Sequence, residues 1–259
     1  YAQSSTESKK LKDSTGNDLV SVTTGQSVTV TDDVSAPTVS SVSTSASDAT
    51  YGIGDVIPIL IQFNEVVNVA GTPTIELETG TLDATAVYAS GTGTDTLTFN
   101  YTVLSTHVAT DLDYKATTSL ALPTNSDTIR DNLATNATLT LATPGQSNSI
   151  SDDQAIVIDG VRPTFTGYAG DAGTTTITIT AGEVLSGAPD GSDFTVTSAA
   201  GVGNTVTAAT LAGDGQSIAL TLTNMIQNDA DLNVTYAQNS TEDKKLKDPN
   251  GNDLVSVTT

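Results

Sequence analysis

Short runs in which every second residue is apolar recur throughout this sequence of 259 residues. The run VIPILIQF at 56–63 places Ile57, Ile59 and Ile61 on one side of an extended chain, and TLTFNYTV at 96–103 shows the same alternation. A strand with one buried face has this period of two, whereas an amphipathic helix repeats every 3.6 residues. Breaks rich in glycine separate the runs at a spacing typical of a β-sandwich. The sequence therefore predicts an all-β fold with no long helix.

The same pattern predicts further strands in both halves of the chain. In the first half they lie near 74–79, 84–89, 137–142 and 154–159, and in the second half near 174–180, 193–198, 204–211, 217–223, 231–236 and 254–258.

Two similar segments indicate where one module joins the next. TDDVSAPTV at 31–39 and VIDGVRPTF at 157–165 each place an aspartate four residues before a proline, which holds the backbone extended. We therefore expect tandem immunoglobulin-like β-sandwiches: residues 1–33 as the tail of a preceding module with its linker, 34–160 as a first sandwich and 161–259 as a second.

The sequence also contains a long internal repeat. Residues 1–24 and 236–259 align without a gap, are identical at 20 of 24 positions, and differ at residues 4, 8, 14 and 15 and their partners. The period is 236 − 1 = 235 residues. The first copy runs on into GQSVTVTD at 25–32, which reads as a strand. We expect an excerpt of a longer array whose module 161–259 lacks its last strand; the alternative is a protein that ends at this point.

Composition excludes several classes of protein. There are 30 acidic residues, 24 of them Asp, against 9 basic ones, so phosphate contacts to nucleic acid are not expected. Absence of cysteine excludes disulfides, zinc–thiolate sites and thiol catalysis. No stretch approaches the roughly 18 apolar residues of a transmembrane helix, so direct membrane insertion is not expected either.

Aspartate-rich turns in an all-β chain raise the possibility of bound Ca²⁺, which prefers several carboxylate and carbonyl oxygens. Successive strands of a sandwich reverse direction, so alternate loops should gather at each end of a module. The alternative is an acidic surface that only keeps the chain soluble. The predicted ligands at the first joint are Asp32, Asp33, Glu65 and Asp95, and those at the second are Asp48, Asp55, Asp111, Asp113 and Asp159, with Glu183 from the following module.

No residue pattern predicts an enzyme. The single histidine, His107, lies in a predicted loop without a G-x-S-x-G motif, and we expect it to be exposed. A glycosidase cleft is disfavoured because the chain has no tryptophan to form a sugar platform.

The one basic patch, Lys244, Lys245 and Lys247, recurs as Lys9, Lys10 and Lys12; it is either a charged edge that blocks strand pairing or a contact to an acidic neighbour.

Several segments resemble known families. YGIGDVIPILIQFNEVVNVAGTPTIELETG, DLDY and AIVIDGVRPTF resemble a bacterial immunoglobulin-like repeat of large surface adhesins and biofilm-matrix proteins, and GEVL, DLNVTYAQ and LKDPNGNDLVSV are similar to the SwmB-type repeat. The turn expected as Asp-x-x-Gly-Asn is kept at 248–252. It departs at RDNLATNAT, where Ala134 and Thr135 occupy the Gly-Asn positions, so neither a tight turn nor an ion site is expected there.

The resemblance implies a non-enzymatic, extracellular, cell-surface role as a stiff spacer or adhesive segment, with calcium at the module joints. Its partners would be neighbouring copies of the repeat, surface glycans or other cells. The alternative is a subunit of a self-assembling S-layer, sheath or filament in which one chain completes the sandwich of the next. A carbohydrate-binding module is a third possibility.

Overall fold

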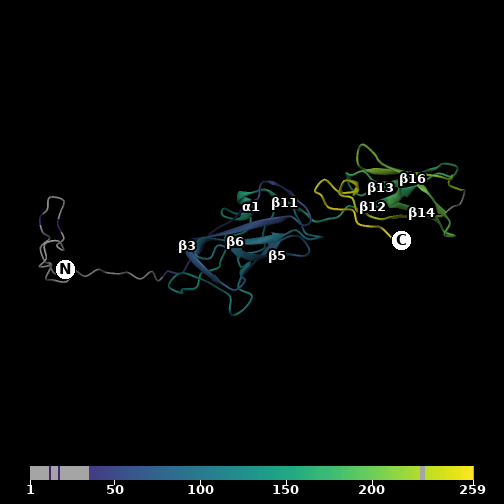
Figure 1. Ribbon diagram of the computed structural model, residues 1–259. Helices are drawn as coiled ribbons and strands as arrows, with labels where there is room; N and C mark the ends of the chain where they lie inside the picture. The colour runs from purple at the N-terminus through teal and green to yellow at the C-terminus, as the bar shows by residue number, and fades with distance from the viewer. Residues whose placement is uncertain (1–11, 13–16, 18–34, 228–230, 259) are drawn as a thin grey trace. The chain divides into compact units, whose positions relative to one another are not determined.

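The computed structural model describes residues 12, 17, 35–227 and 231–258, and it is all-β, as the sequence predicts (Figure 1). The chain divides into two compact units, residues 1–35 and 36–259, and every strand named below lies in the second. Within the described part of the chain, no helix has the length and apolar character needed to span a membrane. The one α-helix given there, α1, is a single turn at Ile150–Asp153.

Two sheets enclose the first hydrophobic core. The larger sheet has the order β1-β3-β6-β5-β4-β8, with β10 paired to β3 and β9 to β4, and the smaller has the order β2-β11-β7. The strands of the larger sheet are β1 (Val39–Thr44), β3 (Val56–Ala70), β4 (Thr74–Glu78), β5 (Ala84–Ser90), β6 (Thr94–Thr102), β8 (Asp113–Tyr114), β9 (Leu120–Ala121) and β10 (Thr128–Arg130). Those of the smaller sheet are β2 (Ala49–Tyr51), β7 (Val108–Ala109) and β11 (Ile156–Asp159).

Two further sheets enclose a second core. One has the order β12-β13-β17-β16 and the other β15-β14-β18. Their strands are β12 (Phe165–Ala169), β13 (Thr176–Ala181), β14 (Phe194–Ser198), β15 (Gly203–Asn204), β16 (Val206–Leu211), β17 (Ser217–Leu222) and β18 (Leu232–Tyr236), accompanied by the short 3-10 helices η2 (Gly191–Asp193) and η3 (Glu242–Lys244).

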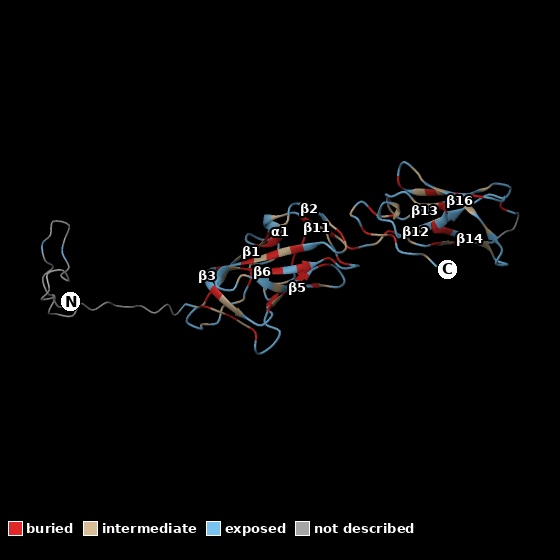
Figure 2. Ribbon diagram, in the orientation of Figure 1, coloured by how far each residue is buried: buried red, intermediate tan, exposed pale blue. Residues whose placement is uncertain are grey.

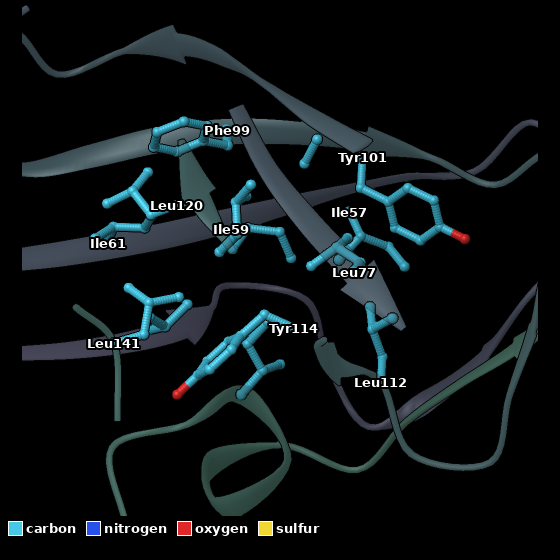
Figure 3. Close-up of a cluster of buried hydrophobic side chains, with 14 of the residues drawn as sticks. Ile57, Ile59, Ile61, Leu77, Phe99, Tyr101, Leu112, Tyr114, Leu120 and Leu141 are labelled. Carbon is cyan, nitrogen blue, oxygen red and sulfur yellow. The ribbon is translucent and has the colours of Figure 1, made fainter. Parts of the chain in front are cut away.

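The alternating residues form the cores, as predicted. Ile57, Ile59 and Ile61 of β3 are fully buried against Phe99 and Tyr101 of β6 (Figure 3). Buried and more exposed positions alternate along the central strands (Figure 2). Each fully buried aliphatic or aromatic side chain contributes about 1.5–3 kcal/mol through removal of apolar surface from water. A separate cluster, which runs from Ile177 to Leu254, fills the second core.

Three sequence expectations need correction or remain open. The predicted strands 137–142 and 254–258 are not strands; each makes only isolated bridges, among them Thr38 with Thr138 and Tyr236 with Val257. These short apolar runs pack on a core without a continuous partner strand beside them. The predicted boundary between residues 160 and 161 stays a prediction, and the predicted tail 1–33 lies outside the described residues, apart from Lys12 and Asn17.

The turn at 131–135 forms in spite of its departure from Asp-x-x-Gly-Asn. Asp131 Oδ1 accepts hydrogen bonds from the N–H groups of Leu133 (2.8 Å) and Thr135 (2.7 Å), and the N–H of Asp131 donates to the carbonyl oxygen of Thr135 (3.1 Å). Ala134 adopts a φ of 66°. The expectation of no tight turn here was therefore wrong, because an alanine accepts the left-handed conformation where the aspartate holds the loop closed.

This conformation gives a stability prediction. Replacing Ala134 by glycine should raise the free energy of unfolding by about 1 kcal/mol, because glycine has no Cβ to strain a left-handed residue. The matched change Gly251→Ala, at a φ of 86° in the second such turn, should lower it by about the same amount. Urea denaturation of both variants measures this, and equal signs for the two changes would contradict it.

Candidate metal centre

Three carboxylates lie close together at the junction between the first core and the second. One oxygen from each of Asp159, Glu183 and Asp248 lies within 4.8 Å of the other two. Asp159 and Glu183 belong to the predicted second-joint group, and the structure brings them together. Asp248 was not among the predicted ligands.

Three different elements place these side chains. Asp159 is the last residue of β11, where it pairs with Val108 of β7. Glu183 follows β13, whose end is fixed because the N–H of Gly182 donates to the carbonyl oxygen of Thr164 (2.8 Å). Asp248 opens the turn 248–252 and is only 2% exposed. The cluster is therefore built from segments on both sides of the joint, which we define as residues 159–163.

The turn 248–252 has the same internal hydrogen bonds as the turn 131–135. Asp248 Oδ1 accepts from the N–H groups of Asn250 (2.8 Å) and Asn252 (2.9 Å). In addition, Asn252 Nδ2 donates to Asp248 Oδ2 (2.7 Å). The equivalent atom in the other turn, Asp131 Oδ2, is buried without a hydrogen-bond partner because Thr135 has no amide group.

Asn252 joins this turn to the first core. It is 1% exposed, and its Oδ1 accepts from the N–H of Ile53 (2.6 Å). Its Nδ2 also donates to the carbonyl oxygens of Asp159 (2.8 Å) and Val161 (3.2 Å). One buried amide thus contacts the loop before β3, the joint and the carboxylate of Asp248.

Neighbouring residues complete this contact. A Cβ on Gly52 would lie 2.4 Å from the carbonyl oxygen of Asn250, so only glycine allows the turn to approach. Asn250 Nδ2 donates to Asp159 Oδ2 (2.6 Å), and Arg162 Nη1 donates to the carbonyl oxygen of Asp253 (3.0 Å).

The cluster concentrates negative charge. Burial raises the pKa of Glu183, and the nearby carboxylates of Asp248 and Asp159 raise it further. Two like charges about 5 Å apart repel by about 3 kcal/mol at an effective dielectric constant of about 20. Either a proton on Glu183 or a cation between the three groups relieves this repulsion.

The donor set fits Ca²⁺. All three ligands are hard oxygens, and oxygens within 4.8 Å of one another can share one ion whose Ca–O distances are about 2.3–2.6 Å. Asp159 and Asp248 accept hydrogen bonds that orient them, and each carboxylate oxygen has a further lone pair for a cation. Calcium takes six to eight oxygens, so water or carbonyl groups would supply the remainder.

Asp111, another predicted ligand, lines a cavity beside the cluster. The cavity has a volume of about 570 Å³, and Glu78, Asp159 and Asn250 also line it. Burial raises the pKa of Asp111, with the charge of Asp113 adding to the effect. The carboxylates of Glu78 and Asp111 therefore line the same cavity as Asp159 of the cluster.

The other predicted second-joint ligands hold the backbone of loops. Asp113 is 7% exposed and accepts from the N–H of Gly145 (2.8 Å) and from Ser151 Oγ (2.8 Å). Asp48 accepts from the N–H of Ala155 (3.0 Å), and Asp55 from that of Gly52 (2.9 Å). Their role as ligands stays a prediction.

The structure describes two of the four ligands predicted at the first joint. Glu65 is half-buried, and exposed Asp95 accepts from Thr96 Oγ1 (3.0 Å). Asp32 and Asp33 lie outside the described residues. Within the ranges that the structure covers, Asp159, Glu183 and Asp248 make the one such group of three.

His107 is buried, so the expectation of an exposed side chain was wrong. It is 7% exposed, the N–H of Leu104 donates to its Nδ1 (3.2 Å), and Tyr101 Oη lies 3.1 Å from the same atom. Nδ1 therefore acts as an acceptor, which places the proton of the neutral ring on Nε2.

Burial also lowers the pKa of His107 from its usual 6.5. The stability that the neutral ring contributes is complete above about pH 6.5, and it falls at lower pH because the unfolded chain takes up the proton more readily. His107→Asn keeps an acceptor for Leu104 without titrating. We expect the free energy of unfolding to fall less between pH 7 and pH 5 in this variant than in the wild type, and parallel pH profiles would rule this out.

Part of the chain is similar to a known repeat family. Residues 158–241 match the SWM repeat, a family described as "Putative flagellar system-associated repeat". No curated protein and no solved structure matches the chain. The matched segment contains Asp159 and Glu183 and ends before Asp248. The predicted SwmB-type resemblance of the C-terminal half is thus confirmed, whereas the adhesin-type resemblance of the first half stays a prediction.

Proposed function

We propose that this chain is a non-enzymatic repeat unit of an extracellular surface protein, in which it acts as a stiff spacer or adhesive segment of adhesin or biofilm type. The match of residues 158–241 to a repeat family supports the tandem organisation, as does the repeat of 1–24 at 236–259. Such arrays act through reach and stiffness, and their modules contact mainly their neighbours along the chain.

The observation that carries the proposal is the carboxylate cluster at the joint. A Ca²⁺ ion bound by Asp159, Glu183 and Asp248 would connect β11 of the first core with two loops of the second. The ion would remove the repulsion between the carboxylates and restrict motion at the joint. The hydrogen bonds of Asn252 to Ile53 and Asp159 hold the turn 248–252 against the first core at the same place.

The non-enzymatic part of the proposal rests on the chemistry of the reactive residues. The ring of His107 is held by the N–H of Leu104 and the buried hydroxyl of Tyr101, and no serine or threonine hydroxyl is among its partners in the described residues.

Thermal denaturation with calcium and with a chelator tests the proposal. Calcium in excess of its dissociation constant should raise the melting temperature, and the chelator should reverse this. Binding at 100 times the dissociation constant stabilises by about 2.7 kcal/mol, equivalent to about 5–10 °C for a domain of this size. Identical melting curves in both conditions would remove calcium from the proposal.

The alternative is a subunit of a self-assembling S-layer, sheath or filament. One observation favours it: residues 1–24 repeat residues 236–259 at 20 of 24 positions, so each chain carries a segment equivalent to part of a neighbouring copy. Solution scattering at increasing concentration separates the two functions, because a spacer stays monomeric at all concentrations whereas a subunit associates.

A further inference from the structure

The turn 248–252 contains an Asn-Gly pair. Asn250 is followed by Gly251, and no other asparagine of the sequence precedes a glycine. Asparagine is thermolabile, because the backbone nitrogen of the next residue can attack the carbon of its side-chain amide. Glycine favours this attack, since it has no Cβ beside the nitrogen and its backbone rotates freely. The pair therefore has the chemistry for spontaneous deamidation.

Both residues of the pair have access to solvent. Gly251 is exposed, has a φ of 86°, and has no atom within 4 Å of the place where a Cβ would lie. Asn250 is half-buried and lines the cavity of about 570 Å³ next to the carboxylate cluster, together with Glu78 and Asp111. Water can thus reach the amide that is lost, and no neighbouring side chain covers the nitrogen that attacks.

Three hydrogen bonds hold the pair in the closed joint. Asn250 donates through its N–H to Asp248 Oδ1 (2.8 Å) and through Nδ2 to Asp159 Oδ2 (2.6 Å). The N–H of Gly251 donates to the carbonyl oxygen of Asp248 (3.2 Å). Deamidation bonds the nitrogen of Gly251 to Cγ of Asn250 and expels Nδ2, so the contacts of Gly251 with Asp248 and of Nδ2 with Asp159 are both lost. The closed joint therefore slows the reaction, and opening of the joint allows it.

We propose that Asn250 deamidates when the joint opens, and that the product places a fourth carboxylate next to Asp159. The inference rests on the proposed calcium joint for the control of the reaction, and it adds a modification that changes the charge of the same site. The other copy of the repeat has Thr15 at this position, so the reaction is specific to the copy at 236–259.

The reaction requires only water as a co-reactant. The nitrogen of Gly251 gives up its proton and bonds to Cγ of Asn250, the bond from Cγ to Nδ2 breaks, and the amide leaves with that proton as ammonia. Water then adds to one of the two carbonyl carbons of the resulting succinimide, and the bond from that carbon to the ring nitrogen breaks. The products are aspartate and isoaspartate, and both carry a carboxylate in place of the neutral amide.

The new charge makes the cluster depend more strongly on a cation. A carboxylate at residue 250 would repel Asp159 at the place where the amide now donates to it. It would also join the three carboxylates of the cluster as a further hard oxygen donor for Ca²⁺. Asn250→Asp imitates the aspartate product. This variant should melt at a lower temperature than the wild type in chelator, and its dissociation constant for calcium should be about threefold lower or less.

Peptide mapping by mass spectrometry follows the reaction at each asparagine. The full chain is incubated at mildly alkaline pH, in calcium and in chelator. Asn239 is the internal control, because its Nδ2 also donates to a carboxylate, Asp193 Oδ1 (2.7 Å), but Ser240 follows it. In chelator we expect Asn250 to convert about tenfold faster than Asn239. Calcium should slow the conversion of Asn250 by about threefold or more.

Asn252→Ala tests the control by the joint without a change of metal. It removes the acceptor for the N–H of Ile53, so it should speed the conversion of Asn250 in calcium. Similar rates for Asn250 and Asn239 in chelator would overturn the inference, whatever calcium does to the melting temperature. Equal rates for Asn250 in calcium and in chelator, with an intact melting response, would overturn the control by the joint. Failure of the calcium proposal differs from both, because it abolishes the melting response and leaves Asn250 faster than Asn239.

Discussion

Asp248→Asn should reduce by half or more the rise in melting temperature that calcium, at about 100 times its wild-type dissociation constant, gives to the wild-type chain. Asparagine keeps an oxygen acceptor for the N–H groups of Asn250 and Asn252, but it removes one of the three charges that would bind the ion. We expect the dissociation constant for calcium to increase at least tenfold, equivalent to about 1.4 kcal/mol of binding free energy. Isothermal titration calorimetry and melting curves in calcium and in chelator measure the two effects.

Asp131→Asn is the matched control for this change. Asp131 opens a turn with the same internal hydrogen bonds, is also buried, and lies in the first core rather than in the cluster. The calcium response of this variant should equal that of the wild type. Loss of the response in both variants would show that the turn, rather than the cluster, is responsible.

Asn252→Ala should loosen the joint and lower the free energy of unfolding by about 2–4 kcal/mol. The change leaves the N–H of Ile53, the carbonyl oxygen of Asp159 and Asp248 Oδ2 without their amide partner. Buried groups without partners cost more than the hydrogen bonds themselves contribute. Urea denaturation measures the global loss.

Amide hydrogen exchange of Ile53 reports on the joint separately, since its N–H donates to Asn252 Oδ1. We expect exchange at Ile53 to increase more than exchange at Ile59, which lies within the paired part of β3. Thr135→Ala, at the equivalent place of the other turn, should cost less than about 1 kcal/mol. Equal losses at Asn252 and Thr135 would contradict a special role for the buried amide.

The sequence predicted the parts of the fold that depend on local alternation. Ile57, Ile59 and Ile61 must share a face in any strand, so a buried core followed directly from their spacing. The run 254–258 alternates in the same way, yet Val257 alone makes a backbone bridge, to Tyr236. Strand formation there depends on a partner strand, which the sequence pattern does not specify.

Two of the three carboxylates of the candidate site were predicted from the sequence, and the third was not. Asp159 and Glu183 lie at strand ends near one joint, so topology alone placed them together. Asp248 comes from a turn, and its direction depends on the two N–H groups that hold its Oδ1. The Asp-x-x-Gly-Asn pattern at 248–252 is the sequence feature that could have indicated Asp248 as a ligand. An aspartate that closes such a turn with one oxygen has its second oxygen left for another ligand. The contact of Asn252 with Ile53 had no signal in the sequence.

The central claim, a joint stiffened by calcium, is tested most directly by residual dipolar couplings of backbone amides. The measurement compares the alignment tensor of residues 39–158 with that of residues 165–258, in calcium and in chelator. With calcium, the couplings of both segments should fit one tensor, whereas in chelator the two segments should require tensors of different magnitude. Two different tensors in saturating calcium, or one shared tensor in both conditions, would contradict the claim.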